Sequence, residues 1–314
     1  MKKVLLSGIQ PTGTLHIGNY FGAIKQFVDM QDTYESYVFI ADLHALTTVW
    51  DKETLKKNVF DIAAAYMACG LDPQKVTLYR QSAIGGLVSE LTWIFNCVTT
   101  VAYLERGHAY KDSSAKQKES TMGLLDYPAL MAADILIQDP HVVPVGQDQK
   151  QHIEFTRDIA QKFNNTWGEV CAMPEPLILE SVATVVGTDG RKMSKSYGNT
   201  IPLFGTDEEL EKAVMGIVTD SSGDVPVNVR AIHELFRSKE ELDALYTEHK
   251  GKYKALKEAL LSDVKQFVAP LREKYEHLQK NPELVWDALK TGEAQANNRA
   301  EKKMVAIKQA VGLM

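Results

Sequence analysis

KVLLSGIQPTGTLHIGNYFGAI, residues 3–24, is the part of the chain from which its fold can first be read. The apolar run 4–6 is typical of a strand that is buried on both faces of a parallel sheet. A turn rich in glycine and proline follows at residues 7–13, and a helix is expected to begin near His16. The apolar residues that then recur at helical spacing are Ile17, Tyr20, Phe21 and Ile24. A strand, a glycine-rich turn and a helix N-terminus offer unpaired N–H groups and a positive dipole end to a phosphate.

The composition is that of a globular protein with a sizeable core. The chain has 314 residues, of which 45% are hydrophobic and 24% charged, enough for one large domain or two ordinary ones. Because it runs directly into a predicted strand and has no apolar run near the roughly 20 residues of a membrane span, we expect a cytoplasmic protein without a signal peptide. Cys69, Cys97 and Cys171 are scattered, so we expect buried, reduced and inert thiols rather than disulfides or a zinc or iron–sulfur site.

The charge is distributed unevenly. The net charge of −6 leaves no basic surface for non-specific binding of nucleic acid. Residues 251–314, however, carry 12 Lys and Arg against 8 Asp and Glu. Any contact with nucleic acid is therefore expected in this final stretch.

Strands and helices alternate along the first part of the chain. The predicted strands cover residues 4–6, 37–42, 75–79, 142–145 and 182–186. Asp51 is expected to cap the helix after the second strand, and residues 148–163 form a helix after the fourth. This alternation predicts right-handed βαβ units and a mostly parallel sheet. Residues 84–137 are helical in pattern without strands, which indicates an insertion between two halves of the sheet domain.

Beyond Asn199 the pattern is helical. The predicted helices cover residues 208–218, 239–250, 252–278 with a kink at Pro270, and 301–311. We therefore predict an α/β domain at residues 1–199, with its helical insertion at 84–137, and an all-helical domain at 200–314.

A second informative stretch is GTDGRKMSKSYGN, residues 187–199. Its glycines predict a mobile turn, and Lys192 and Lys195 place two ammonium groups three residues apart. Flexible point charges suit a triphosphate, because they can follow the charge that develops on a leaving pyrophosphate as a loop closes.

Taken together, the two stretches resemble the class I aminoacyl-tRNA synthetases. Residues 16–19 match the HIGH signature, with Asn19 at the last position, and residues 192–196 match the KMSKS signature without change. The resemblance extends to SGIQPTG at 7–13, DLHALT at 42–47, YPALMAADIL at 127–136 and PVGQDQKQH at 144–152. These segments look like the bacterial tryptophanyl branch. The resemblance implies a Rossmann-like catalytic domain at 1–199 and a helical anticodon-binding domain at 200–314.

A third group of residues indicates what the site selects. We expect a helix to open at Tyr127, with Pro128 in its first turn. Tyr127, Met131 and Asp134 would then lie at i, i+4 and i+7 on one face. An indole has a flat apolar ring and one N–H donor, so a single buried acceptor, Asp134, suffices for it while Met131 packs on the ring. An Asp that only pairs inside a helix bundle is the structural alternative.

Matching positions carry further roles over from the resemblance. The ATP site would consist of Gln10, Pro11, Thr12, His16, Gly18, Asn19, Gly146, Gln147, Asp148, Val185, Lys192, Met193, Ser194, Lys195 and Ser196. Within it, His16, Lys192 and Lys195 would be catalytic, Asp148 would hold the ribose, and Val185 would pack on the adenine. The tryptophan site would consist of Gln10, His44, Tyr127, Met131 and Asp134. His44 can also be interpreted as a satisfied core histidine.

Three residues depart from the usual bacterial pattern. Leu43 stands where Gln is common, Gln147 where Glu is common and His16 where Thr is common. The turn before Lys192 is also shorter. These changes are consistent with a divergent or auxiliary form.

The resemblance implies activation of L-tryptophan by ATP and its transfer to tRNA(Trp). The carboxylate of the amino acid attacks the α-phosphorus in line, so no general base is required, and Mg²⁺ would be bound through the ATP phosphates without a protein ligand set. It also implies a homodimer joined through residues 84–137. The alternatives are the same chemistry with tyrosine, and a paralogue that binds nucleotide or RNA without charging it.

Overall fold

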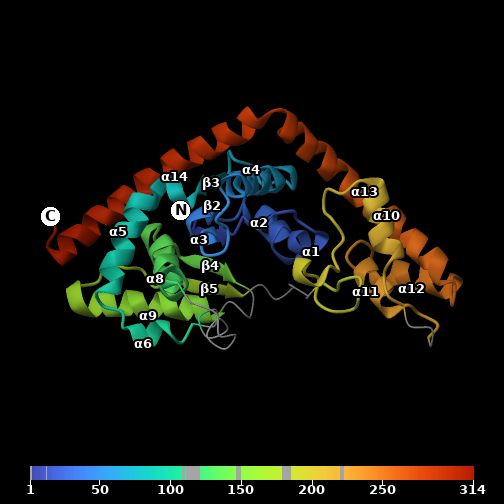
Figure 1. Ribbon diagram of the computed structural model, residues 1–314, viewed down its shortest axis with the longest axis horizontal. Helices are drawn as coiled ribbons and strands as arrows, with labels where there is room; N and C mark the ends of the chain where they lie inside the picture. The colour runs from blue at the N-terminus through green and yellow to red at the C-terminus, as the bar shows by residue number, and fades with distance from the viewer. Residues whose placement is uncertain are drawn as a thin grey trace.

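A five-stranded parallel sheet forms the centre of the structure (Figure 1). The computed structural model describes residues 2–11, 13–107, 110, 121–145, 150–178, 185–219 and 223–314. The strands are β1 (Val4–Ile9), β2 (Glu35–Ile40), β3 (Val76–Arg80), β4 (Val142–Val145) and β5 (Glu175–Ile178). Their order is β3-β2-β1-β4-β5, and neighbours pair in parallel. The predicted α/β class with a mostly parallel sheet is therefore confirmed.

The strand order reverses between β1 and β4. The chain proceeds from β1 through β2 to β3 on one side, and from β4 to β5 on the other. In open parallel sheets the crevice beyond the carboxyl ends of two such strands is the usual ligand site. The glycine-rich turn 10–16 follows β1 directly, so the topology alone predicts a ligand site there.

Alternate residues of β2 face two hydrophobic cores. Val38 and Ile40 pack into one core with residues of α4 (Lys52–Ala68) and of the C-terminal helices, whereas Tyr37 and Phe39 pack into the other with α5 (Gly85–Asn96), α8 (Met122–Ile137) and α9 (Lys150–Trp167). A strand sends successive side chains to opposite faces, so both faces of the sheet are covered.

The first helix begins where the sequence predicts. His16 is the N-cap of α1 (Ile17–Asn19), which continues through the π-helical turn η1 (Tyr20–Ile24) into α2 (Lys25–Met30). After β2 comes the short helix α3 (Asp42–Ala45). The side chain of Asp51 accepts a hydrogen bond from the N–H of Thr54 at 2.8 Å, so its predicted role as the cap of α4 is confirmed.

Between β3 and β4 the described residues form helices and no strand, as predicted. They are η2 (Gln81–Ile84), α5, α6 (Val101–Leu104) and α8. The prediction that a helix opens at Tyr127 is wrong. The helix α8 begins after Thr121, whose side chain caps it by accepting from the N–H of Leu124, and Pro128 therefore lies in the helix interior. Without an N–H, Pro128 cannot donate to the carbonyl of Leu124 one turn earlier.

The fifth strand lies earlier in the sequence than predicted. Of the expected strand 182–186, residues 182–184 lie outside the described residues, and Val186 forms an isolated antiparallel bridge with Lys192. The edge strand is β5, which contains Pro176. A proline is tolerated at a sheet edge because its missing N–H faces away from the ladder.

The C-terminal part is helical, as predicted. It contains η4 (Lys195–Tyr197), α10 (Asp207–Met215), α11 (Val227–His233), α12 (Lys239–Glu248), α13 (Tyr253–Lys280) and α14 (Pro282–Val311). Pro270 lies within α13. The last helix is far longer than the predicted 301–311, and in Figure 1 α13 and α14 arch over the molecule until α14 covers the edge of the sheet at β3. A Cβ added at Gly292 of α14 would lie only 2.0 Å from the carbonyl oxygen of Leu78 in β3.

Two further expectations from composition can be compared with the structure. Cys69 and Cys171 are buried, but Cys97 is exposed at the end of α5, so the prediction of a buried thiol is wrong there. In the described residues, no helix combines the length and apolarity that a bilayer crossing requires.

Candidate functional site

The end of β1 and the turn after it contain two glycines with a structural role. At Gly8 in β1 an added Cβ would lie 2.5 Å from the ring of Phe39, so only glycine fits there without a shift. Gly13 adopts a left-handed φ of +82°, which glycine accepts without strain. Gln10 is exposed at the mouth of this turn and Pro11 is buried, while Thr12 lies outside the described residues. The turn thus brings backbone, rather than bulky side chains, to the carboxyl end of β1.

His16 closes this turn as a buried side chain. Its own N–H donates to the Oδ1 of Asn19 at 3.0 Å, so Asn19, at the last position of the first signature, caps the helix start. Burial and the nearby charge of Lys195 lower the pKa of His16 to about 4, and the imidazole is neutral at pH 7. Its Nδ1 is buried without a hydrogen-bond partner among the described residues. A neutral ring can offer a ligand a hydrogen bond, but not a full positive charge.

The second signature folds onto the first. The N–H of Met193 donates to the carbonyl of Val185 at 2.8 Å, which holds the loop against Val185. The buried Met193 then packs against Gly18, where an added Cβ would lie 3.2 Å from its sulfur and 2.9 Å from Nδ1 of His16. The two predicted segments are therefore in contact, although Gly18 and Met193 are far apart in sequence.

Lys195 extends toward the same turn. A Cβ added at Gly13 would lie 3.9 Å from the Nζ of Lys195, and the lysine is close enough to lower the pKa of His16. Partial burial in turn lowers the pKa of Lys195 itself. Lys192 is also exposed; it forms an isolated bridge with Val186, and its carbonyl accepts from Nδ2 of Asn199 at 3.1 Å. The hydroxyls of Ser194 and Ser196 are hydrogen-bonded to each other at 2.9 Å.

Asn199 holds this loop together, a role that sequence reasoning missed. Its Oδ1 accepts from the N–H of Ser194 at 2.8 Å, and its Nδ2 also donates to Asp189 at 2.6 Å. The hydrogen bond from Asn199, helped by Arg191, lowers the pKa of Asp189 to about 2. The residue stands at the end of the quoted stretch, but no feature of the sequence indicates that its side chain turns back into the loop.

The residues of the predicted amino-acid site form a second group, at the carboxyl ends of β2 and β3. Asp134 is almost fully buried on α8, and burial raises its pKa well above the usual range even though a hydrogen bond from Gln81 opposes the shift. The Nδ1 of His44 lies 3.5 Å from Oδ2 of Asp134. Burial lowers the pKa of His44, so this contact is not an ion pair at neutral pH. Met131 is partly buried on the same helix.

Gln81 joins these two side chains, and it too was missed. Fully buried at the carboxyl end of β3, it donates from Nε2 to Asp134 at 2.7 Å and lies 2.9 Å from Nδ1 of His44. Its position directly after a parallel strand is a signal that could have found it, since ligand-site residues gather at these ends.

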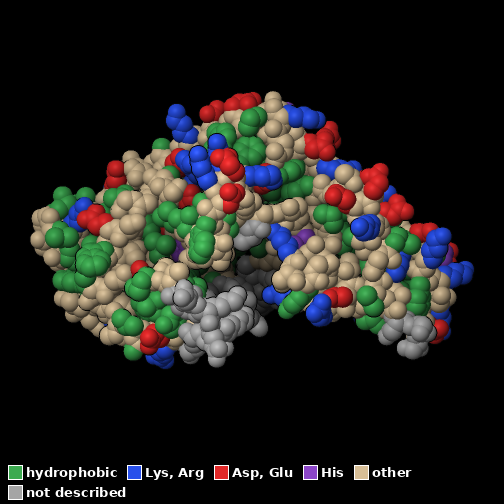
Figure 2. Space-filling model, in the orientation of Figure 1, with side chains coloured by type: hydrophobic (Ala, Val, Ile, Leu, Met, Phe, Trp, Pro, Cys, Tyr) green, Lys and Arg blue, Asp and Glu red, His purple; other side chains and the backbone are tan. Residues whose placement is uncertain are grey.

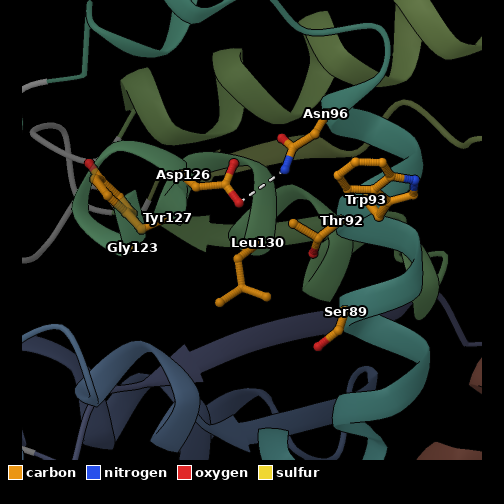
Figure 3. A pocket seen from close by; sticks show the side chains of 8 residues that line it. All are labelled: Ser89, Thr92, Trp93, Asn96, Gly123, Asp126, Tyr127 and Leu130. Atoms are coloured by element: carbon orange, nitrogen blue, oxygen red, sulfur yellow. Dashed lines mark hydrogen bonds between the residues drawn. The ribbon is translucent and has the colours of Figure 1, made fainter. Parts of the chain in front are cut away.

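A cavity of about 310 Å³ lies beside Tyr127, between α5 and α8 (Figure 3). Its lining consists of Ser89, Thr92, Trp93, Asn96, Gly123, Asp126, Tyr127 and Leu130. Figure 3 shows Asp126 and Asn96 bridging the two helices through a 3.0 Å hydrogen bond, with Trp93 at the edge. Neither Met131 nor Asp134 lines this cavity, so it is distinct from the Asp134 group although both adjoin Tyr127.

Some predicted residues cannot be placed. Gly146, Gln147 and Asp148 lie outside the described residues. Val185 is described; it is buried and belongs to the same core as Met193 and Ile17. Among the described residues, no group of three or more His, Cys, Asp or Glu side chains could hold a metal ion.

Known proteins resemble the whole chain. The family described as tRNA synthetases class I (W and Y) matches residues 2–279. A tryptophan–tRNA ligase of Fusobacterium nucleatum is 50% identical over 98% of both chains, and one of Campylobacter jejuni is 45% identical over 98% of this chain and 99% of its own. The crystal structure of the Campylobacter jejuni tryptophanyl-tRNA synthetase with ADP and tryptophan aligns with a TM-score of 0.92 at 44% identity, over 98% of this chain and 99% of its own. A tyrosyl-tRNA synthetase of Archaeoglobus fulgidus shares the fold, with a TM-score of 0.64 at 19% identity.

Proposed function

The chain belongs to the class I tRNA synthetases for tryptophan and tyrosine, and on this premise we infer how its residues divide the work. It activates L-tryptophan with ATP and transfers the amino acid to tRNA(Trp). The structural observation that carries the mechanism is the convergence of Lys195 and Met193 on the turn that contains His16. Tryptophan rather than tyrosine follows from the relatives that are 45–50% identical over nearly the full chain.

We propose that ATP lies over the turn after β1. The backbone of Gly13 leaves room for phosphates, the N-terminus of α1 favours negative charge, and Lys195 provides a point charge. The unpartnered Nδ1 of His16 supports a polar ligand at this point, since a buried polar atom without a partner costs free energy. The ribose and adenine contacts proposed for Gly146, Gln147, Asp148 and Val185 follow the resemblance.

Activation forms one bond and breaks one. A carboxylate oxygen of tryptophan bonds to the α-phosphorus, and the bond from that phosphorus to the bridging oxygen breaks, with the electron pair leaving on pyrophosphate. The nucleophile is already an anion, so no proton moves, and catalysis consists of alignment and charge stabilisation. The neutral His16 acts as a hydrogen-bonding group, while Lys195 and Lys192 supply positive charge. In the transfer step, a terminal ribose hydroxyl of tRNA bonds to the activated carbonyl carbon, and the bond from this carbon to the phosphate oxygen breaks. AMP leaves, and its phosphate takes up the hydroxyl proton.

Mg²⁺ would be bound through oxygens of the ATP phosphates. Such an ion usually keeps several waters and is held largely by substrate phosphates. Bound there, it would neutralise part of the phosphate charge.

We propose that Asp134 accepts the indole N–H. Its carboxylate is buried, its helix also carries Met131 and Tyr127, and His44 closes the same group. Gln10, exposed at the end of β1, would contact the polar part of the amino acid.

We further propose a cytoplasmic homodimer that is joined through the insertion. Large hydrophobic side chains are exposed on the insertion and beside it, at Leu46, Trp50, Trp93, Val101 and Met122, with Trp50 81% and Trp93 71% exposed. Figure 2 shows hydrophobic side chains gathered on the side of the molecule around α5 and α9, whereas charged side chains of both signs follow α13 and α14. Residues 200–314 would bind the anticodon, with the basic stretch 251–314 as the surface expected to face RNA.

The function is tested by pyrophosphate exchange with a panel of amino acids, followed by aminoacylation of total tRNA. Exchange that depends on tryptophan and exceeds that with tyrosine supports the assignment. Preference for tyrosine would reassign the substrate. Normal adenylate formation without charging of any tRNA would favour the non-charging paralogue instead.

A further inference from the structure

We propose that Gln81 is a positioning residue of the tryptophan site. It orients Asp134 as a hydrogen-bond acceptor and holds His44 in the tautomer that carries its proton on Nε2. This inference rests on the proposed role of Asp134 toward the indole. It concerns a residue that touches Asp134 and His44 rather than the substrate.

The orientation of the Gln81 amide is fixed by its backbone partners. One end of the amide lies 3.1 Å from the N–H of Leu43 and 3.2 Å from the N–H of His44. Backbone N–H groups can only donate, so this end must be the carbonyl oxygen. The NH₂ group of Gln81 therefore points to the other side, toward Asp134 and His44.

The two N–H bonds of this NH₂ group then have one partner each. One donates to Oδ2 of Asp134 at 2.7 Å, and the other points to Nδ1 of His44 at 2.9 Å. A proton on Nδ1 would set two donors against each other at that distance, so Nδ1 must accept. The proton of the neutral imidazole therefore resides on Nε2.

The consequence for the substrate follows from counting donors and acceptors. A carboxylate can accept several hydrogen bonds, so Asp134 keeps acceptor capacity for one N–H while Gln81 occupies Oδ2. Because His44 cannot donate from Nδ1, the carboxylate has no need to turn toward the imidazole. Gln81 is fully buried and bridges three elements, so both side chains are held before any substrate arrives. Such preorganisation favours a ligand that brings one donor, and it rejects an isostere without one.

The experiment compares the full-length wild type with Gln81→Met, Gln81→Glu and the control Gln138→Met. Methionine keeps the shape of glutamine without its hydrogen bonds. Glutamate keeps an acceptor for Leu43 and His44 but loses the NH₂ donor. Gln138 is equally buried, but its Nε2 donates to the carbonyl of Ala296 on α14 rather than to Asp134. The probes are tryptophan and its benzothiophene analogue, in which sulfur replaces the indole N–H.

We expect both Gln81 variants to raise the KM for tryptophan roughly 10- to 100-fold, as expected for the loss of a hydrogen bond to a charged group, without changing the KM for ATP. The ratio of kcat/KM for tryptophan to that for the analogue should fall in these variants and stay at the wild-type value in Gln138→Met. An unchanged ratio in both Gln81 variants would overturn the proposal. Failure of the wild type to use tryptophan would instead overturn the proposed function.

The proposal can also be tested without a variant of Gln81. In ¹⁵N NMR of histidine-labelled wild type, with His44 assigned by its loss in His44→Asn, Nδ1 should be unprotonated and Nε2 protonated. A proton on Nδ1 of His44 would overturn the proposal even if neither Gln81 variant folds.

Discussion

The sulfur of Met193 packs against Gly18, so closely that a Cβ added to this glycine would lie 3.2 Å from it. The centre of the second signature therefore rests on the centre of the first. Met193 is buried, and its N–H is hydrogen-bonded to Val185. This contact therefore fixes the position of the lysine loop relative to the turn after β1. Lys195 follows two residues later and extends toward that turn from a loop that Met193 holds in place.

Gly18→Ala should therefore disturb the site although it adds only a methyl group. The new Cβ would lie 2.9 Å from Nδ1 of His16 as well as against Met193, so both must move. We expect a loss of roughly 100-fold in tryptophan-dependent exchange, in line with misplacement of reacting groups by about 1 Å. Gly86→Ala is the matched control, because an added Cβ there meets nothing within 4 Å. Wild-type rates in Gly18→Ala would show that the contact is unimportant.

His16 should titrate far below an ordinary histidine. Burial and Lys195 lower its pKa from 6.5 to about 4. Since the folded pKa is the lower one, the neutral ring contributes stability above pH 6.5, and this contribution is lost as the pH falls through about 4. NMR titration should give a pKa near 4 in the wild type and a higher one in Lys195→Ala. The same pKa in both would mean that the lysine does not approach the imidazole.

Asp134→Asn should raise the stability of the protein and lower its activity. Burial raises the pKa of Asp134 above its ordinary 3.8, so the penalty on the folded state grows as the pH rises from 3.8 toward the raised value, and an amide carries no such penalty. The gain in Tm of the variant over wild type should therefore grow with pH, by about 2–4 °C for each kcal/mol. The KM for tryptophan should rise while that for ATP does not. A variant with lower Tm than wild type at pH 8 would contradict this account of the buried carboxylate.

Gly292→Ala should destabilise the fold, against the usual effect of this change in a helix. Alanine ordinarily stabilises a helix interior by about 1 kcal/mol relative to glycine. Here the added Cβ would meet the backbone of Leu78 at 2.0 Å, so α14 must move away from β3. We expect a net loss of roughly 3 kcal/mol or more by denaturant unfolding, with Gly86→Ala as the control. A stabilised Gly292→Ala would show that α14 does not lie so close to the sheet.

The sequence predicts some levels of this structure better than others. The start of α1 and the cap at Asp51 depend on local chemistry, and each is where the sequence places it, whereas residues 7–9 of the expected turn 7–13 belong to β1. The predicted helix 301–311 is too short because the middle of the buried face of α14 consists of small residues, Gly292, Ala296 and Ala300, which give a weak amphipathic signal. A helix that packs directly on a strand needs such residues, but only the tertiary contact reveals why.

The same limit applies to the site. Asp134 and His44 could be selected one by one, whereas Gln81 acquires its meaning only from partners 53 and 37 residues away in sequence. Pro128 shows the reverse case, because a local rule placed it in the first turn while the cap at Thr121 starts α8 earlier.

The most direct measurement of the central claim, that both signatures act on one triphosphate, is tryptophan-dependent pyrophosphate exchange in Lys195→Ala. The control is Lys254→Ala, whose side chain is 82% exposed on α13 and contacts only Glu258, at 3.8 Å, in the described part of the chain. We predict a fall of roughly 100-fold or more in Lys195→Ala, comparable to the loss of a preorganised charge-stabilising donor, and no change in Lys254→Ala. Equal exchange in wild type and Lys195→Ala would contradict the account.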